Sequence, residues 1–340
     1  MLAVLIERPG GPEVLQIATQ PRPRPKTGEV LVRVFAAGVN RPDVQQRRGL
    51  YPPPPDASPI PGLDVAGCVE AVGEGVGAWQ PGDAVCALVN GGGYAQFCVV
   101  PAVQCMPVPR GFSYIAAASL PEVFFTAWNN LMWLARLAEG EALLIHGGTS
   151  GVGMAGIQMA RHLRNATVFA TAGSDEKRAM CTAIGARAAL DYRGAWDEEI
   201  RALTQGRGVN VILDGQAGPD TQRQLDVLDH DGRLVFIASH QAATAQVDIR
   251  SLVRRRLTIT GSTLRPRPSR YKGRIAKELV DQVWPLLEDG RIVTHIHEVV
   301  ALSQVQAAHR ILDENRQIGK VVLAVDPAHA EAIPAPNPQS

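Results

Sequence analysis

The segment from Leu143 to Gly156 constrains the fold of this chain more than any other. An apolar run ending at His146 leads into clustered glycines, and the glycines lead into a segment with the apolar periodicity of a helix. Glycine permits a tight turn and the close approach of a phosphate. A helix N-terminus adds unpaired N–H groups and the positive end of its dipole. A strand, a glycine turn and a helix in this order predict a seat for the pyrophosphate of a dinucleotide.

Two frames of glycines compete within this segment. One frame matches G-x-G-x-x-G by letter and runs from Gly151 to Gly156. The other begins at Gly147 or Gly148, because the preceding strand should end near His146. We prefer the second frame, since strand–turn–helix context gives the pattern its meaning, and a purely structural glycine turn is the alternative. The residues expected to contact the cofactor here are Gly148, Ser150, Gly151, Val152 and Gly153.

Length and composition narrow the class of protein. The 340 residues suggest roughly two domains, and a net charge of +1 with 46% hydrophobic residues is ordinary for a globular protein. No apolar run reaches the ~18 residues of a membrane-spanning helix, and the N-terminus reads as a first strand rather than a signal peptide. The five cysteines are odd in number and form no C-x-x-C motif, so we expect reduced thiols in a cytoplasmic protein.

The pattern of the chain changes near Pro121. Residues 1 to 122 read as short strands closed by Gly and Pro, which predicts a barrel-like β domain. After a linking helix, strands and helices alternate up to about residue 262, which predicts a doubly wound parallel sheet. We expect the last part of the chain to return to the first domain, and the Pro- and Ala-rich tail 327–340 to be disordered. Strands of the parallel sheet are expected at 143–146, 167–171, 188–191, 209–214, 233–238 and 257–261.

The second strand of the alternating region indicates which dinucleotide binds. An NAD site carries an acid about 20 residues past the glycines for the ribose 2′-hydroxyl, whereas this strand ends in Gly173-Ser174. Lys177 lies one helical turn further on and Tyr192 follows the third strand, so both can bind a 2′-phosphate. Asp175 reads as the N-cap of its helix. These residues favour NADPH, with an ordinary exposed helix lysine as the alternative for Lys177.

Several motifs together resemble a known family. They are Met1–Val4, Gly10–Glu13, Val39–Asp43, Pro61–Asp64, Gly147–Gly153, Thr171–Ser174 and Ile318–Val322. With them the chain resembles the zinc-independent quinone oxidoreductase (zeta-crystallin-like) branch of the medium-chain dehydrogenase/reductase superfamily. Within that branch it is most similar to the tumour-suppressor-inducible quinone oxidoreductase subfamily. The resemblance covers about residues 1 to 325.

This resemblance implies an α/β fold in which a doubly wound (Rossmann) domain is inserted in a GroES-like β-barrel catalytic domain. The catalytic domain would comprise residues 1–122 and 266–326, and the NADPH-binding domain residues 123–265, with the catalytic cleft between them. Family members are commonly homodimers or larger assemblies that pair through an edge strand of the nucleotide domain. We therefore expect a homodimer or homotetramer that pairs through 257–261.

The resemblance also bears on metal binding. Zinc-containing relatives place a Cys at the position of Asn40 and a His at that of Leu63, and their structural zinc lobe needs four closely spaced cysteines. Residues 87–100 contain one cysteine, Cys98. Zinc requires nitrogen or sulfur ligands in tetrahedral geometry, so we expect no metal. A quinone or an enone is then the suitable acceptor, because it is already electrophilic and needs only hydrogen-bond help.

Two residues are expected to assist the acceptor. Asn40 can donate its amide N–H to an acceptor oxygen, and Tyr51 can donate its phenol or pack on a flat ring. The alternatives are that Asn40 caps a turn and that Tyr51 is an ordinary loop aromatic. Asp64 reads as a structural hydrogen-bond acceptor, and Asp43 as an N-cap or a partner of Arg47.

Later loops are expected to complete the cofactor site. Ser239 and Gln241 follow a strand end, where doubly wound sheets bind ligands. His240, between them, reads as a loop residue near the nicotinamide rather than as a base. The resemblance places Thr126 at the nicotinamide end. The remaining expected cofactor contacts are Thr263, Leu264 and Lys320.

These features together predict an NADPH-dependent quinone reductase with a small-molecule substrate. The closest alternative is an enone or enoyl-thioester reductase, and a crystallin-like NADPH-binding protein with little turnover is the alternative from another class. The arginines between residues 254 and 270 form the one basic cluster, but aromatic side chains for base stacking are nearly absent beside it. That composition argues against nucleic-acid binding.

Overall fold

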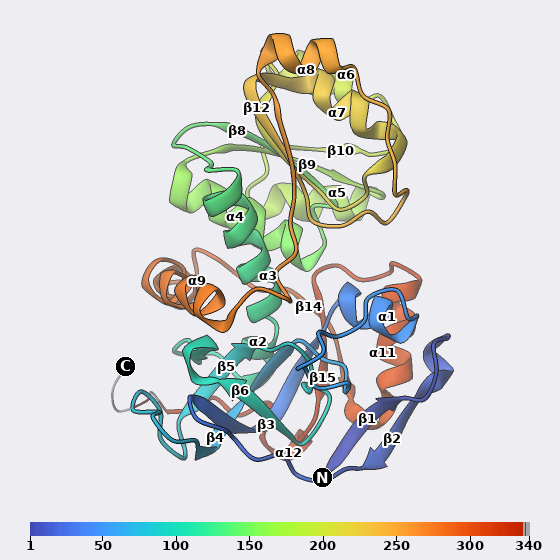
Figure 1. Cartoon of the computed structure of the whole chain (residues 1–340). Coiled ribbons are helices and arrows are strands. Elements are labelled where there is room, and N and C mark those ends of the chain that lie inside the picture. Colours follow the sequence, from blue (N-terminus) through green and yellow to red (C-terminus); the bar gives the residue numbers. More distant parts are fainter. Residues whose placement is uncertain (336, 338–340) are drawn as a thin grey trace. The chain divides into compact units, whose positions relative to one another are not determined.

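The chain forms two units in the computed structural model, which describes residues 1–335 and 337 (Figure 1). One unit, the split unit, comprises Met1–Phe125 and Arg265–Ser340, and the other, the nucleotide unit, comprises Thr126–Leu264. The first boundary lies three residues after the expected position, and the second lies one residue before it. The nucleotide unit is thus an insertion within a unit made from both ends of the chain.

A sheet of seven strands forms the centre of the split unit, with a separate two-stranded sheet beside it. Hydrogen-bonded neighbours follow the order β14-β15-β3-β4-β5-β7, and β6 pairs with β3 off this path. The strands are β1 (Leu2–Ile6), β2 (Leu15–Thr19), β3 (Glu29–Val39), β4 (Asp64–Val72), β5 (Ala84–Leu88), β6 (Phe97–Pro101), β7 (Cys105–Pro107), β14 (Ile296–Ala301) and β15 (Lys320–Ala324). β1 and β2 form the two-stranded sheet.

The C-terminal strands β14 and β15 complete the sheet that the N-terminal segment begins, as expected from the sequence. β15 pairs antiparallel with β3, and in their register Val321 lies opposite Val39. Because Lys320 precedes Val321 and Asn40 follows Val39, this register brings two residues 280 positions apart into hydrogen-bond contact. The pairing of the chain ends therefore builds part of the polar site described below.

Helices of the split unit surround this sheet. They are α1 (Arg41–Arg47), α2 (Tyr114–Ala118), α3 (Pro121–Ala127), α9 (Ser269–Gln282), α10 (Trp284–Glu288), α11 (Val305–Asp313) and α12 (Pro327–Ala330), with 3₁₀ turns η1 (Pro12–Val14), η2 (Ala102–Gln104) and η5 (Leu302–Gln304). α3 continues across the unit boundary into the π-helical turn η3 (Trp128–Leu134), so the expected linking helix is wider in its second half.

The tail from residue 327 onward differs from the expected disorder in its first residues. Pro327–Ala330 form α12, and the Ala332 carbonyl accepts from the Tyr114 N–H. Asn337 donates to and accepts from the Ala84 backbone. Composition alone suggested disorder because Pro and Ala bury little apolar surface, but backbone and amide hydrogen bonds hold this segment against the sheet. The other tail residues, 336 and 338–340, lie outside the described residues.

The nucleotide unit contains a six-stranded parallel sheet, which confirms the expected alternation. Its order is β10-β9-β8-β11-β12-β13, so the chain starts in the middle, builds outward one way, and then crosses to build the other side. Its strands are β8 (Ala142–His146), β9 (Thr167–Ala172), β10 (Ala188–Asp191), β11 (Val209–Asp214), β12 (Leu228–Phe236) and β13 (Thr258–Gly261). Sheets of this kind bind ligands where the winding reverses, at the carboxyl ends of β8 and β11.

Helices follow the strands of the nucleotide unit in turn. They are α4 (Gly151–Arg164), α5 (Asp175–Ala183), α6 (Trp196–Leu203), α7 (Thr221–Val227) and α8 (Ile249–Arg255), with the 3₁₀ turn η4 (Gly218–Asp220). All residues of α4 from Gly153 to Ala160 are buried, and all of them except Gln158 are small or apolar, which lets the helix pack closely on the sheet.

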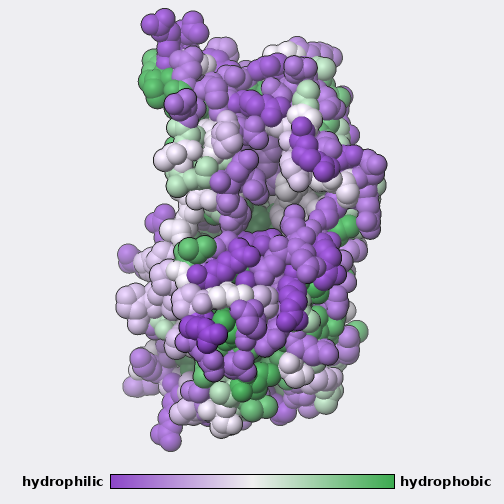
Figure 2. Space-filling model, turned by 90° about the vertical axis from the view of Figure 1, so that its right-hand side faces the viewer, coloured by the Kyte–Doolittle hydropathy of each residue, from purple (hydrophilic) through white to green (hydrophobic). Residues whose placement is uncertain are grey.

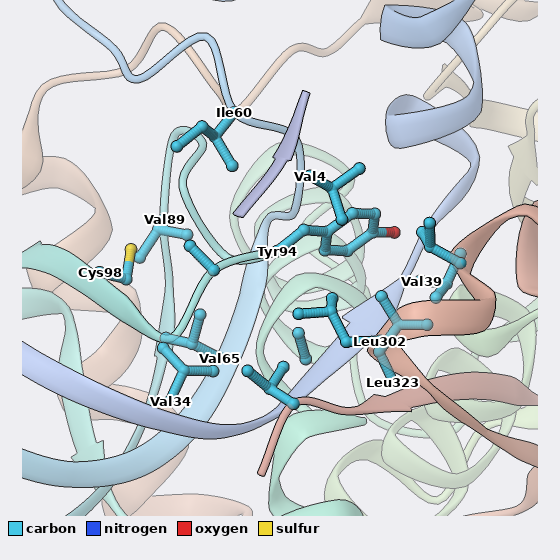
Figure 3. Packing of buried hydrophobic residues seen from close by; sticks show 14 of the residues in the cluster. Val4, Val34, Val39, Ile60, Val65, Val89, Tyr94, Cys98, Leu302 and Leu323 are labelled. Carbon is cyan, nitrogen blue, oxygen red and sulfur yellow. The ribbon is translucent and has the colours of Figure 1, made fainter. Parts of the chain in front are cut away.

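Each unit has its own apolar core. In the split unit, side chains from β3, β4, β15 and the loop after β5 meet around Tyr94 (Figure 3). In the nucleotide unit, Leu144, Phe169 and Ile212 from neighbouring strands pack with Trp196 of α6. The outer surface is mixed: the face shown in Figure 2 is mostly hydrophilic, with small apolar patches between.

A buried histidine joins α11 to α1 in the split unit. Arg47 is 1% exposed; it donates to His309 Nδ1 at 3.3 Å and to Asp313 at 2.9 Å. Its Nε donates to the Gly10 carbonyl at 3.1 Å. Burial, together with the positive charge of the neighbouring Arg47, lowers the pKa of His309 to about 3. His309 is therefore neutral in the folded protein at physiological pH.

This histidine predicts a loss of stability in mild acid. In the unfolded chain an imidazole titrates near pH ~6.5, so on acidification the unfolded state takes up a proton that the folded state does not. The free energy of unfolding should fall by about 1.4 kcal/mol between pH 7.5 and 5.5 from this group alone. Urea unfolding at both pH values measures it. His309→Asn, which keeps an acceptor for Arg47 but does not titrate, should remove that part of the pH dependence. His230→Asn, at an exposed side chain, should leave it as in the wild type.

Candidate functional site

The glycine turn after β8 is built as the second frame predicts. β8 ends at His146, Gly147 adopts φ +75°, and α4 begins at Gly151 with Ser150 as its N-cap. Ser150 Oγ accepts from the Gly153 N–H at 3.0 Å. The first turn of a helix has no intrahelical partners for its N–H groups, so those of Gly151 and Val152 remain to meet an anion.

Close packing requires glycine at two of these positions. A Cβ on Gly153 would lie 2.4 Å from the Gly147 carbonyl oxygen, and a Cβ on Gly148 would lie 2.6 Å from Cys181 Sγ. The Gly148 N–H is also tied to the Thr171 carbonyl of β9 at 2.9 Å. The turn is therefore held against the sheet with no side chain in the way, and this cradle fits a dinucleotide pyrophosphate.

The tip of β9 carries a hydroxyl where an NAD site has a carboxylate. Ser174 is the N-cap of α5, and its Oγ accepts from the Lys177 N–H at 3.2 Å. The sequence interpretation of Asp175 as the N-cap was therefore wrong. Ser174 has the extended backbone of a cap residue (φ −143°, ψ 160°), and Asp175 already lies in the first turn, where its charge favours the helix dipole.

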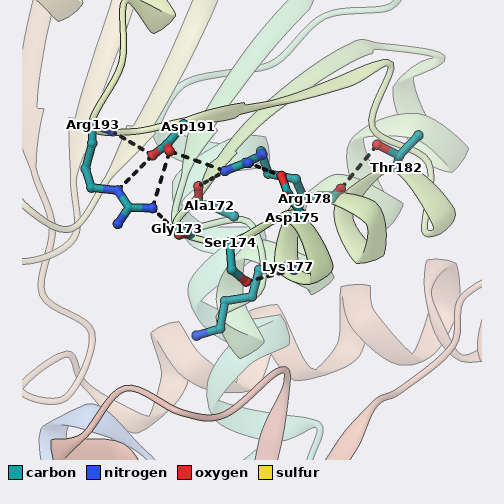
Figure 4. Close-up of polar contacts among 9 residues, drawn as sticks. All are labelled: Ala172, Gly173, Ser174, Asp175, Lys177, Arg178, Thr182, Asp191 and Arg193. Atoms are coloured by element: carbon teal, nitrogen blue, oxygen red, sulfur yellow. Dashed lines mark hydrogen bonds and ion pairs between the residues drawn. The ribbon is translucent and has the colours of Figure 1, made fainter.

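Two arginines that the sequence interpretation missed lie beside this tip (Figure 4). Arg193 donates to the Gly173 carbonyl and pairs with Asp191 at 3.1 Å, while Arg178 pairs with Asp175 and lies 3.5 Å from Asp191. The Arg193 side chain lowers the pKa of the Asp191 carboxyl. The Asp191 carboxylate at the end of β10 is thus paired with guanidinium groups.

Lys177 and Tyr192 complete the surroundings of the β9 tip. Figure 4 shows the Lys177 side chain extending away from the carboxylates of Asp175 and Asp191. The Tyr192 ring packs on Gly173, since a Cβ there would lie 2.8 Å from its Cε1. The structure therefore brings the four residues predicted for the 2′-phosphate into one cluster, with cations around it.

The other predicted cofactor contacts lie in the loops after the strands. Ser239 and Gln241 are exposed beyond the end of β12, where the Gln241 N–H donates to the Gln216 carbonyl at 2.9 Å. Thr263 and Leu264 follow β13. Thr126 is half-buried at the end of α3. No contact among the described residues tests whether these five meet a cofactor, and they stay predictions.

Asp64, at the start of β4, is the centre of a buried polar cluster in the split unit. Its Oδ1 accepts from the Glu122 N–H at 2.6 Å. Its Oδ2 accepts from Asn40 Nδ2 and Lys320 Nζ, each at 2.8 Å. A Cβ on Gly38 would lie 2.5 Å from Asp64 Oδ2, so glycine in β3 leaves room for the carboxylate. The sequence interpretation of Asp64 as a structural acceptor agrees with these contacts.

Asn40 and Lys320 are bound to each other as well as to Asp64. Asn40 Oδ1 accepts from Lys320 Nζ at 2.5 Å. The second hydrogen of the Asn40 amide is directed at the Gly38 carbonyl at 3.5 Å. Asn40 is 5% exposed and Lys320 6%, so both side chains are engaged inside the protein. These contacts do not test the predicted donation from Asn40 to a substrate or the predicted contact of Lys320 with a cofactor, and both stay predictions.

Asp43 is a second fully buried carboxylate next to this cluster. It accepts from the Asn40 N–H at 2.8 Å, the Gly62 N–H at 3.1 Å and the Tyr94 hydroxyl at 3.1 Å. Burial raises its pKa to about 6 against the lowering effect of the backbone donors. The N-cap of α1 is Asn40, and Asp43 is the third residue of the helix, whose carboxylate accepts from the Asn40 N–H. Arg47 pairs with Asp313. Both interpretations of Asp43, as an N-cap and as a partner of Arg47, were therefore wrong, whereas the alternative of Asn40 as a cap agrees with the structure.

Tyr51 lies in the loop between α1 and β4, where its side chain is half-buried. The guanidinium of Arg265 lies 5.3 Å from the centre of its ring. Sequence reasoning did not foresee this contact, because 214 positions separate the two residues. The ring is therefore positioned by a buried cation of its own unit.

The arrangement of donor groups bears on metal binding. Among the residues that the structure describes, no three His, Cys, Asp or Glu side chains gather as a metal would require. At the Asn40–Asp64 cluster the Lys320 ammonium already contacts both other side chains. An ammonium group at that spot does not fit a Zn²⁺ ion, because two cations would share one carboxylate.

Comparisons with known proteins agree with the two-unit fold. The family model for the alcohol dehydrogenase GroES-like domain matches residues 26–110, and that for zinc-binding dehydrogenase matches residues 151–281. A rat protein named quinone oxidoreductase is 33% identical over 78% of this chain and 80% of its own length. The chain belongs to the medium-chain dehydrogenase/reductase superfamily. The expected fold class, a Rossmann domain inserted in a GroES-like domain, is thereby confirmed.

Other members of the superfamily differ in what their names state. A mycobacterial protein solved in complex with NADPH is 30% identical, covers 95% of this chain and 100% of its own, and has a TM-score of 0.86. The CurK enoyl reductase is 27% identical, covers 95% and 98%, and has a TM-score of 0.83. A Mycobacterium tuberculosis polyketide synthase subunit is 32% identical over 98% of this chain, which spans 15% of that relative's length.

Membership of this superfamily supports an oxidoreductase with a nicotinamide cofactor, and the glycine cradle of this chain fits a dinucleotide. It does not by itself decide the acceptor, the quinone-specific subfamily or the choice between NADPH and NADH. A separate observation concerns membranes: none of the helices among the described residues has the length and hydropathy needed to cross a bilayer.

The Lys320–Asp64 contact predicts a large effect on stability. Lys320→Met should lower the free energy of unfolding by about 3–5 kcal/mol, because it leaves the buried Asp64 carboxylate without its cation. Lys277→Met is the matched control, since Lys277 pairs with Asp281 at the surface of α9 and should cost no more than about 0.5 kcal/mol. Chemical denaturation of both variants gives the comparison. Equal losses in the two variants contradict the assignment.

Proposed function

We propose that this chain is a zinc-independent NADPH:quinone oxidoreductase. The observation that carries the proposal is the Asn40–Asp64–Lys320 cluster, in which a buried ammonium group takes the place where a metal would need ligands. Such a site offers no Lewis acid to polarise an ordinary ketone. An acceptor that is already electron-poor, such as a quinone, does not need one. Relatives named quinone oxidoreductase support this choice.

The cofactor proposal rests on the β9 tip. Ser174 offers a hydroxyl there, Lys177 and Arg193 offer cations, and the Asp191 carboxylate is already paired. A 2′-phosphate has about two negative charges and is attracted to such a cluster, whereas a ribose 2′-hydroxyl gains little from it. The NADPH complex of the mycobacterial relative agrees with this reading.

Each residue has a distinct role in the proposed reaction. When bound, NADPH supplies the hydride. The turn from Gly148 to Gly153 binds its pyrophosphate, and Thr126 together with the loops holding Ser239, Gln241, Thr263 and Leu264 orients the nicotinamide end. Tyr51 packs on the acceptor ring or donates its phenol to the acceptor oxygen. We assign Asn40 a positioning role, because its amide is held by Asp64 and Lys320.

Reduction of an activated C=C bond is the second candidate. The CurK enoyl reductase and the polyketide synthase subunit share this fold or sequence, which favours an enoyl acceptor. The same hydride donor and the same absence of a Lewis acid serve both reactions. The two candidate reactions therefore differ only in the acceptor, and measured activity with each acceptor distinguishes them.

Assembly through β13 belongs to the same proposal. β13 is an outer strand of the parallel sheet, so one row of its backbone groups has no strand partner within the described chain. Ile249 and Val253 of the neighbouring α8 are 61% and 65% exposed, and Ile259 of β13 is 37% exposed. We propose that a second copy pairs here to give a homodimer or homotetramer, and that the protein acts in the cytoplasm.

The cofactor proposal predicts a change of preference on substitution. Ser174→Asp combined with Lys177→Ala places a carboxylate at the β9 tip and removes a cation, so kcat/KM for NADPH should fall at least about a hundredfold, a change of about 2.7 kcal/mol in transition-state free energy. The value for NADH should hold or rise. Lys277→Ala, at another helix surface, is the control. Equal use of NADH and NADPH by the wild type would overturn the proposal.

An acceptor panel tests the reaction itself. NADPH consumption is followed with ortho-quinones, para-quinones and short enoyl thioesters, with the wild type and Tyr51→Phe. Quinones should be reduced with the higher kcat/KM, and Tyr51→Phe should keep activity if the ring only packs, but lose about tenfold if the phenol donates. Consumption with enoyl thioesters alone favours the second candidate. Tight NADPH binding without consumption favours a binding protein of the crystallin-like kind.

A further inference from the structure

Two cations are buried in the split unit without a carboxylate partner. Arg265, at the start of the second segment of that unit, is 6% exposed, and Lys272 of α9 is 0% exposed. No ion pair within 4.0 Å joins either of them to a carboxylate of the described residues. Burial lowers the pKa of both Arg265 and Lys272, and Asp43 and Asp56 oppose this effect only from a longer range.

The partners of both cations are neutral oxygens. Arg265 Nε donates to the Asn90 carbonyl at 2.9 Å, and its Nη2 donates to that carbonyl and to Gln46 Oε1 at 2.6 and 2.8 Å. Lys272 Nζ donates to Asn90 Oδ1 at 2.6 Å and to the Arg265 carbonyl at 3.1 Å. Asn90 thus binds both side chains and holds the two charges in one neighbourhood.

Two other buried cations of this unit each have the carboxylate partner that Arg265 and Lys272 lack. Arg47 is 1% exposed and pairs with Asp313 at 2.9 Å, and Lys320 is 6% exposed and pairs with Asp64 at 2.8 Å. A buried charge is costly unless an opposite charge compensates it. Burial lowers the pKa of Lys272 to about 8, which is the direction expected for an ammonium group lacking such compensation.

One donor of Arg265 has no partner. Its Nη1 is buried and makes no hydrogen bond with the described residues. The Tyr51 ring lies over the guanidinium, with 5.3 Å between the ring centre and Cζ. The ring therefore stacks on the guanidinium, while the N–H groups of Nη1 are left to donate to an anion.

We propose that Arg265 and Lys272 form a binding site for an anionic oxygen group, a carboxylate or a phosphate, carried by a ligand of this protein, with the Tyr51 ring as its cover. The anion would supply the missing negative charge and bind the Nη1 edge. Gln46 and Asn90 orient the guanidinium through its other nitrogens. Neutral quinones have no such group, so the site goes beyond the proposed reaction and names a feature of a further ligand.

The test is a titration of the purified full-length protein with sodium benzoate and with sodium phosphate. Ionic strength is held constant with sodium chloride at pH 7, and thermal unfolding and tyrosine fluorescence are recorded. Each titration is repeated with saturating NADP⁺, which removes phosphate binding at the glycine turn from the curve. We expect saturable binding of at least one anion, weakened at least about tenfold in Arg265→Gln and in Lys272→Met, equivalent to 1.4 kcal/mol.

Two further variants separate binding from a structural role. Arg267→Gln removes a neighbouring exposed cation that stacks on Tyr271, and it should leave the anion affinity within twofold of the wild type. Tyr51→Leu removes the aromatic cover, and it should tighten anion binding at least about threefold. Benzoate binding alone assigns a carboxylate ligand, and phosphate binding alone assigns a phosphate ligand.

Three outcomes overturn the proposal. They are a response that never saturates, an affinity unchanged in both Arg265→Gln and Lys272→Met, and an equal loss in Arg267→Gln. The titration uses no quinone and measures no turnover. A failure of the proposed quinone reduction therefore leaves its result intact, and the two hypotheses are tested separately.

Discussion

The ion pair between Lys320 and Asp64 links parts of the chain that are 256 positions apart. Lys320 begins β15, Asp64 begins β4, and β3 lies between these strands in the sheet with Asn40 just past its end. The pair also receives the Glu122 N–H near the start of α3, so one carboxylate connects three strands and a helix. Because both charges are buried, each depends on the other, and the geometry around Asn40 depends on both.

The buried cations of the split unit fall into two kinds, those paired with a carboxylate and those without one. Arg47 and Lys320 each contact a carboxylate, and both serve to join elements of the fold. Arg265 and Lys272 contact only neutral oxygens, although they are equally buried. At the β9 tip of the nucleotide unit the cations are instead exposed or half-buried, as suits a site that must exchange a phosphate with solvent.

Local sequence pattern predicted the parallel sheet and the glycine turn well, because both depend on neighbours in the chain. The end of β8 at His146, the frame from Gly148 and the alternation of strands and helices all follow from period and turn residues. The N-cap at Ser174 was assigned one residue late, since Ser and Asp are both good caps and only the backbone angles distinguish them. The expectation of a disordered tail failed in its first residues, because hydrogen bonds join them to residues distant in the chain, such as Tyr114, which local composition does not reveal.

The sequence by itself determined the nucleotide turn, the alternating α/β segment and the lack of an acid at the β9 tip, because these are properties of short stretches. Only the tertiary structure decided which side chains meet. It placed Arg193 beside Gly173, Lys320 beside Asn40, and Arg265 beneath Tyr51. The physical reason is that the free-energy contribution of a charged side chain depends on its burial and on its partners. Strand register and packing determine that burial and those partners, and sequence spacing does not.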